Sequence, residues 1–304
     1  MSTKNPAYQF LESYNPEAVV DLNEFVNAYA HHLLLESNTY KFPIVLDKVF
    51  DRYDLSVYEL PLPGQRGAVT EDFQILVNSS DRSQVRLYSK AHELVEMLIA
   101  AVLAIDPPWL TENQVQELID KKENWCEIGA AEILMPMQFF SLFIADAPFS
   151  LQTAKSVAQG SGLSLIAVIR RMLETGTRSS ALVIWRYAHK SKELALSNAG
   201  QMTLGREFEP RKKLRVYRVY KSPTLKGHIK KHKSVEMDTT IGIAFQTEGT
   251  TLVRGYDYLE IYDDSGFYYT ESMPVRYTDE PMVWSLIFFD EQADEQYLIS
   301  NGVG

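Results

Sequence analysis

Residues 92–96 read His-Glu-Leu-Val-Glu, and these residue types at this spacing could bind a metal ion. On a helix, residues four apart lie on one face, so His92 and Glu96 can point at the same ion. Glu93, one position further round, can then take a proton from an attacking water molecule. A zinc hydrolase helix is expected to read His-Glu-x-x-His, so Glu96 stands where a second imidazole is expected. The HExxE pattern is therefore consistent with a hydrolytic metal site in which one carboxylate replaces a histidine. Such short patterns also occur on ordinary amphipathic helices, so a hydrogen-bonded pair of His92 and Glu93 in the core stays the alternative.

A third ligand must come from another part of the chain, because a zinc hydrolase needs about three protein ligands and one open position. Glu123 and Glu127 follow about 30 residues later, and they share one face of the next predicted helix. Glu132 lies further along the same predicted helix, and the residues alone leave open which of the three acids is the ligand. Cys126 is the single cysteine, which excludes a cysteine-based zinc site and an internal disulfide framework.

The carboxylate of Glu96 changes the expected chemistry of the ion. One histidine and two glutamates bring the charge of a divalent site close to zero, which weakens the pull of the metal on bound water. Hydrolysis at neutral pH is then expected to be slow. Zinc remains the expected cofactor, with manganese or iron as alternatives, because oxygen-rich ligand sets favour harder ions.

The elements that must position these residues are two long helices. The apolar spacing predicts a helix over residues 83–105 that contains the motif and ends before Pro107 and Pro108. A capping box at Thr111 predicts a second long helix that runs to Pro136. Strand-like runs at residues 55–62 and 73–78 precede them, separated by a turn at residues 63–67. Residues 1–148 are therefore predicted to form an α+β domain.

The pattern of polar and apolar residues divides the remainder of the chain into two segments. Residues 149–205 are predicted to be helical, with a helix-turn-helix outline over residues 150–176. The second helix of that outline has only two basic residues, Arg170 and Arg171, so structural support or protein docking is favoured over reading of DNA bases. Residues 206–304 alternate polar and apolar positions in several runs, including 241–247, and are predicted to form a separate β-rich module.

The charge pattern bears on partners and location. The chain has a formal net charge of −10, which argues against nucleic-acid binding by the whole molecule. Residues 211–233 nevertheless contain ten Lys or Arg and no acid, so a solvated face and a docking surface for an acidic partner or nucleic acid both stay open there. No apolar run approaches the length of a membrane span, and the N-terminus has no apolar signal core. A cytoplasmic protein without membrane partners is expected.

Several further matches, in a fixed order, resemble the ImmA/IrrE (DUF955) metallopeptidases. Their core reads as a strand ending I-x-V-N, then R-x-x-F-x-x-A-H-E-L-G-H, and later E-x-x-A-N-x-F-A-A-E-L-L-M-P. The corresponding stretches here are ILVN at 75–78, RLYSKAHELVE at 86–96 and ENWCEIGAAEILMP at 123–136. The upstream PIVL at 43–46 and Gly67 also suit the family. The resemblance covers residues 40–185, and the rest of the chain more loosely.

The resemblance implies a zincin-like peptidase core, a helix-turn-helix-like helical segment and a C-terminal regulatory or sensor-like module. It implies that His92 is the first metal ligand, Glu93 the general base and Glu123 the third ligand, with Glu127 as the alternative if the register differs by one helical turn. The implied substrate is a helix-turn-helix repressor of the XRE type, whose cleavage switches on stress, mobile-element or defence genes. Three positions depart from the family pattern: Val95 replaces its glycine, Glu96 its second histidine, and Gly129 the phenylalanine of F-A-A.

Two functions are consistent with this sequence. The first is a cytoplasmic metalloendopeptidase, with Glu93, Glu123 and the ILMP sequence intact. The second is a weakened or inactive member of the family that regulates a partner without catalysis, which the substitutions Glu96 and Val95 favour.

Overall fold

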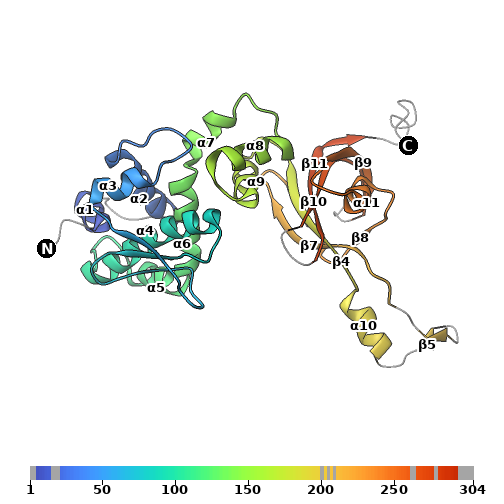
Figure 1. The fold of residues 1–304 in the computed structure, drawn as a ribbon, viewed down its shortest axis with the longest axis horizontal. Helices are drawn as coiled ribbons and strands as arrows, with labels where there is room; N and C mark the ends of the chain where they lie inside the picture. The colour runs from blue at the N-terminus through green and yellow to red at the C-terminus, as the bar shows by residue number, and fades with distance from the viewer. Residues whose placement is uncertain are drawn as a thin grey trace. The chain divides into compact units, whose positions relative to one another are not determined.

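The computed structural model describes residues 5–14, 21–198, 202–203, 206–207, 210–260, 265–276 and 280–293 (Figure 1). The chain forms two compact units, one of residues 1–147 and 156–168 and the other of residues 148–155 and 169–304. Both contain helices and sheets, which confirms the mixed α+β class. The two units divide the predicted segment 149–205 between them, and its predicted end at residue 205 lies outside the described residues.

The first unit combines seven helices of its own with one small sheet among the described residues. Its elements are α1 (Pro6–Ser13), α2 (Leu22–Glu36), α3 (Asp47–Tyr53), β1 (Val57–Leu60), β2 (Gly67–Val69), β3 (Ile75–Asn78), α4 (Ser83–Ile105), α5 (Glu112–Asp120), α6 (Lys122–Leu134) and α7 (Met137–Ile144). Central β3 pairs in parallel with β1 and antiparallel with β2. The chain leaves β3 directly into α4, so this sheet and the motif helix are built from one continuous stretch.

The predicted helix after Thr111 is two helices. The capping box is present, since the Thr111 hydroxyl accepts from the Gln114 amide and the Gln114 side chain accepts from the Thr111 amide. However, α5 ends at Asp120, because Lys121 leaves the helical region with φ −114° and ψ 25°. The prediction of one continuous helix to Pro136 is therefore wrong. The break places Glu123 in the first turn of α6.

Two helices link the units, and their predicted outline is confirmed. They are α8 (Leu151–Ser161) and α9 (Leu165–Glu174), and Gly162 makes the turn between them with φ +70°. A glycine suits this position because left-handed backbone strains residues with a Cβ.

The second unit is built on a six-stranded sheet in the order β8-β7-β4-β11-β10-β9. Its elements are β4 (Ser180–Ala188), α10 (Ser191–Asn198), β5 (Met202–Thr203), β6 (Arg206–Glu207), β7 (Lys213–Lys221), β8 (Ser234–Val235), α11 (Thr240–Gln246), β9 (Val253–Leu259), β10 (Gly266–Val275) and β11 (Met282–Ala293). The pairs β7–β8, β4–β7, β4–β11, β10–β11 and β9–β10 are all antiparallel. Helix α11 packs against β9 and β10 (Figure 1).

Two sequence predictions fail in this unit. Residues 180–188 were expected to be helical but form β4, in the interior of the sheet, where Leu182, Ile184 and Trp185 are buried. Residues 241–247 were expected to be strand-like, but residues 241–246 belong to α11. Short apolar runs do not distinguish a buried strand from a buried helix by periodicity alone.

No single described helix is long and apolar enough to cross a membrane. Helices α6 and α7 pass the same test of length and composition only together, across a 48° bend.

Candidate metal centre

Helix α4 brings the motif residues together as the sequence predicts. His92 is half-buried, Glu93 is buried and Glu96 is half-buried. One ligating atom from each of these three residues lies within 4.8 Å of the other two. The donor set is therefore one imidazole nitrogen and two carboxylate oxygens on consecutive turns of one helix.

Glu123 reaches the same place from the first turn of α6. Its Oε2 lies 3.6 Å from the Nε2 atom of His92, and its side chain is 79% exposed, so it can move toward a shared ion. The Glu127 side chain is also exposed, and its backbone carbonyl accepts a hydrogen bond from the Tyr88 hydroxyl at 3.1 Å. The contact with His92 favours Glu123 over Glu127 as the residue that completes the site.

The Glu93 carboxylate occupies a space that β2 leaves open. Glu93 is 4% exposed, and its Oε2 atom has no hydrogen-bond partner among the described residues. Gly67 of β2 faces this carboxylate so closely that a Cβ at Gly67 would collide with Oε1. Burial, and then the charge of Glu96, raises the pKa of Glu93 to about 8. Without a bound metal ion, Glu93 therefore holds a proton at neutral pH.

Lys122 supplies a cation to this cluster that the sequence did not predict. Its ammonium group forms an ion pair with Oε1 of Glu96, across the contact between α6 and α4. This contact neutralises the carboxylate that replaces the expected histidine. Lys122 could have been predicted from its position next to Glu123. If Glu123 approaches α4 as a ligand, the residue beside it at the start of α6 also lies near α4.

Three sets of contacts fix the position of α4. The buried Tyr29 hydroxyl of α2 donates to the carbonyl oxygen of Leu94 at 3.0 Å. Glu59 of β1 forms ion pairs with Arg86 and with Lys90, both at 3.0 Å. These contacts hold the motif turn against the sheet on one side and against α2 on the other.

The third set joins α4 to α6 through two of the residues that depart from the family pattern. A Cβ at Gly129 would lie 2.7 Å from Cγ2 of Val95 and 2.8 Å from Cγ1 of Val26. The larger residue at position 95 thus faces the smallest residue at position 129. The two departures compensate each other in volume, and the helices approach closely at this point.

Two other residues of α6, Glu132 and Cys126, lie in the core of the unit and have structural roles. Glu132 is buried, and its Oε1 atom contacts Nε2 of His31 at 2.9 Å and accepts from the amide of Met137 at 3.1 Å. It thereby ties α2 and the start of α7 to α6. Cys126 is fully buried, and burial raises the pKa of its thiol to about 12. A thiol with such a pKa is a poor nucleophile at neutral pH.

The residues present fit a divalent cation. The cluster combines an unpartnered buried carboxylate oxygen, a cradle that a side chain at Gly67 would fill, nitrogen and oxygen donors on α4, and the Glu123 carboxylate on α6. A buried carboxylate without a partner is costly, and a cation at this place would remove that cost. The same cation would have to compete with Lys122 for Glu96.

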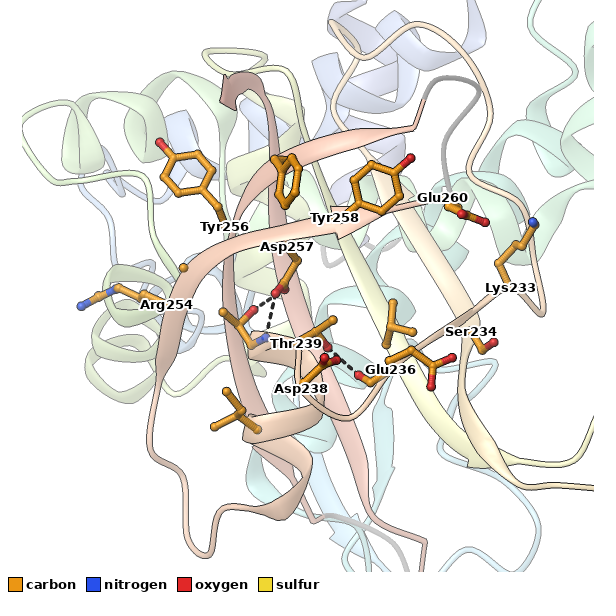
Figure 2. Close-up of a pocket in the computed structure, with 15 residues that line it drawn as sticks. Lys233, Ser234, Glu236, Asp238, Thr239, Arg254, Tyr256, Asp257, Tyr258 and Glu260 are labelled. Atoms are coloured by element: carbon orange, nitrogen blue, oxygen red, sulfur yellow. Dashed lines mark hydrogen bonds between the residues drawn. The ribbon is translucent and has the colours of Figure 1, made fainter. Parts of the chain in front are cut away.

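A second candidate site lies in the other unit. A cavity of about 780 Å³ is lined by residues of β8 and β9, which are the two opposite edges of the six-stranded sheet (Figure 2). At its floor, the buried Asp257 accepts from the Thr240 amide at 2.7 Å and from the Thr240 hydroxyl. Arg254, Tyr258 and Glu260 stand along its rim (Figure 2). The cavity thus combines aromatic and charged side chains.

Comparisons with known proteins bear on the fold. No protein-family model and no curated protein matches this sequence. A solved structure described as a Mycobacterium tuberculosis transcriptional regulator is similar, with a TM-score of 0.51 and 14% sequence identity. The match covers 95% of this chain and 81% of that chain. At this level of identity the similarity concerns the fold alone, and it extends over both units.

Proposed function

We propose that the first unit is a metal-dependent endopeptidase core of the ImmA/IrrE type. The observation that carries the proposal is the cluster of His92, Glu93 and Glu96, whose ligating atoms converge within 4.8 Å. Glu123 approaches the same cluster from α6. The contact between Val95 and Gly129 adds support. Both positions depart from the family motif, and the larger residue at 95 packs against the smaller residue at 129.

In this proposal His92, Glu96 and Glu123 would hold the ion, with zinc the expected metal and manganese or iron as alternatives. The bound metal would supply Lewis acidity toward the scissile carbonyl group. Glu93 is the proton acceptor: its carboxylate is buried beside the ligands, and its raised pKa suits a base that works near neutral pH. Loss of a proton from Glu93 becomes easier once a cation offsets the charge of Glu96.

The proposed substrate is an XRE-type helix-turn-helix repressor, as the family resemblance implies. The second unit then has a regulatory role, with the cavity between β8 and β9 as the place where an effector would bind. Its volume falls within the range of small-molecule sites, and its rim provides both aromatic and charged groups.

The test combines metal content with cleavage. The purified protein is depleted of metal, reloaded in turn with Zn²⁺, Mn²⁺ and Fe²⁺, and incubated with a repressor encoded beside its gene. Cleavage that depends on metal and is lost in Glu93→Gln is expected. Equal cleavage by Glu93→Gln, or no cleavage with any of the three ions, would contradict the enzyme.

The ion pair between Lys122 and Glu96 favours a second candidate, a regulator without catalysis. A lysine that holds the variant ligand can replace the metal as the neutralising charge and keep the scaffold folded. The variant Glu96→His separates the two functions. If Glu96→His binds zinc and the unmodified protein binds no divalent ion, the site has lost its metal and the second candidate is supported.

A further inference from the structure

The charges of the two units differ strongly. The residues of the first unit include ten Lys or Arg and 22 Asp or Glu, a net charge of −12. Those of the second include 20 Lys or Arg and 18 Asp or Glu, a net charge of +2. Ten of these 20 basic residues fall within positions 211–233, which contain no acid. The basic character is therefore concentrated on β7 and on the connection from β7 to β8.

Arginine and tyrosine side chains from α9, β4 and β7 form two groups of contacts in the second unit. We call Arg170, Arg186, Tyr217, Arg218 and Tyr220 the arginine–tyrosine surface. The guanidinium carbon of Arg170 lies 5.1 Å from the ring centre of Tyr220, and Nη1 of Arg218 donates to the Tyr220 hydroxyl at 3.1 Å. The guanidinium carbon of Arg186 lies 5.7 Å from the ring centre of Tyr217. Tyr217 is still 46% exposed.

Part of the positive charge here is neutralised within the unit. Lys213 pairs with Glu236, Arg215 with Glu193, and Arg186 with Glu280. The connection from β7 to β8 adds further exposed lysines beyond these pairs: Lys226, Lys230, Lys231 and Lys233. Cationic groups thus flank the exposed ring of Tyr217 and the half-buried ring of Tyr220 along a strand of nine residues, which is about 30 Å long.

This combination suits one class of anionic partner. Lysine and arginine along a track bind phosphates without regard to sequence, and tyrosine rings and guanidinium planes stack on unpaired bases. A strand of about 30 Å matches the span of a short single-stranded segment, since such sites cover about 4–16 nucleotides. An acidic peptide would use the lysines and leave the tyrosines without a role. A duplex keeps its bases stacked on each other.

We propose that the arginine–tyrosine surface and the lysines after it bind single-stranded nucleic acid. The proposal does not depend on metal or peptidase activity in the first unit. It predicts that an acidic protein carries a local cationic binding site, through which the second unit contacts a nucleic-acid strand.

The test measures binding of a fluorescent 12-nucleotide strand of mixed sequence, as DNA and as RNA, to the full-length protein over a range of salt concentrations. The expected plot of log affinity against log salt is linear, with a slope of about −0.7 for each phosphate contacted. Tyr217→Leu should weaken binding roughly tenfold with the slope unchanged, because stacking does not involve counterion release. Tyr217→Phe keeps the ring and should bind like the unmodified protein. Lys226→Ala should lower both the affinity and the steepness of the slope.

Tyr40→Leu is the matched control, since Tyr40 is an equally exposed tyrosine of the acidic unit, with 52% exposure. It should leave binding unchanged, and every variant should keep the thermal transitions of the unmodified protein. Three results would overturn the proposal: no binding at low salt, equal affinity for the matched duplex with no effect of Tyr217→Leu, or displacement of the strand by a polyglutamate peptide at equal charge concentration. The last result would assign the surface to an acidic protein partner.

Discussion

At the scale of single residues, the centre depends on which cation accompanies Glu96. A glutamate at this position can hold a metal or a lysine, and the structure pairs it with Lys122. The motif pattern could reveal His92, Glu93 and Glu96 because their spacing lies within one helix. It could not reveal Lys122, because that contact depends on how α6 packs against α4.

We predict that Lys122→Met increases the affinity for Zn²⁺ or Mn²⁺ by tenfold or more, as measured by titration calorimetry. Methionine keeps the apolar stem of the side chain and removes the charge that competes with the ion for Glu96. Lys121→Met is the matched control. Lys121 is the neighbour of Lys122 in the sequence, but its ammonium group pairs with Glu117 at 2.8 Å, outside the metal cluster. Equal metal affinity in all three proteins would show that Lys122 does not limit binding.

The protonation of Glu93 predicts how stability changes with pH in the metal-free protein. Its pKa in the folded state, about 8, lies above the ordinary value of 4.5. Below pH 4.5 both the folded and the unfolded state hold the proton, and its contribution to stability is complete. Between pH 4.5 and 8 only the folded state holds it, so the free energy of unfolding falls as pH rises.

Urea unfolding in the presence of a chelator measures this effect. From pH 5 to pH 8 the unmodified protein should lose about 2–4 kcal/mol more stability than Glu93→Gln, which is neutral at every pH. Glu112→Gln, at an exposed carboxylate on α5, should behave like the unmodified protein. If the curves for Glu93→Gln and the unmodified protein run parallel, Glu93 is ionised in the folded state and its assignment as a proton acceptor with a raised pKa fails.

At the scale of elements, the sequence predicts best where the signal is local. The end of α4 before the two prolines and the capping box at Thr111 are both confirmed, because each depends on a few neighbouring residues. The break at Lys121 and the strand β4 were missed. In β4, the run from Ser180 to Trp185 is buried throughout and shows no alternation, so only the tertiary structure distinguishes it from a buried helix.

The contact between α4 and α6 gives a prediction at this scale. An alanine in place of a helical glycine normally stabilises a helix by about 1 kcal/mol. Gly129→Ala should nevertheless destabilise the protein by about 1–2 kcal/mol, because its Cβ would press on Val95 and Val26. Val95→Ala alone should cost about 2 kcal/mol through the cavity it leaves. The double variant should lose at least about 1 kcal/mol less than the sum.

Urea unfolding of the two single variants and the double variant measures the coupling. Gly160→Ala is the control: it lies in helix α8, and an added Cβ there would meet nothing within 4 Å. This variant should be neutral or slightly stabilised. Additive effects of Val95→Ala and Gly129→Ala would mean that the two side chains do not pack in one shared space. The claim that the departures at positions 95 and 129 compensate each other in volume would then be wrong.

At the scale of the whole molecule, the chain has two compact units with separate cores. The first core lies among α2, α4 and α6, and the second lies between α11 and the six-stranded sheet, around Trp185, Val216 and Ile241. The sequence predicts a change to strand-rich segments near residue 206, whereas the six-stranded sheet already includes β4 at residues 180–188. The residue pattern indicates where helices end and strands begin. The extent of the unit depends instead on which strands pair in one sheet.

We predict that metal binding acts on only one of two thermal transitions. A ligand stabilises the unit that binds it, by an amount that grows with its concentration above the dissociation constant. Calorimetry of the metal-free protein should show two transitions, and Zn²⁺ should raise the temperature of one. Leu94→Ala, in the core beside the motif, should lower the transition that Zn²⁺ raises, and Val183→Ala, in the second core, should lower the other. A single transition that Leu94→Ala and Val183→Ala shift equally would show that the units unfold as one. A Zn²⁺ shift in the transition marked by Val183→Ala would place the metal site outside the α4–α6 cluster.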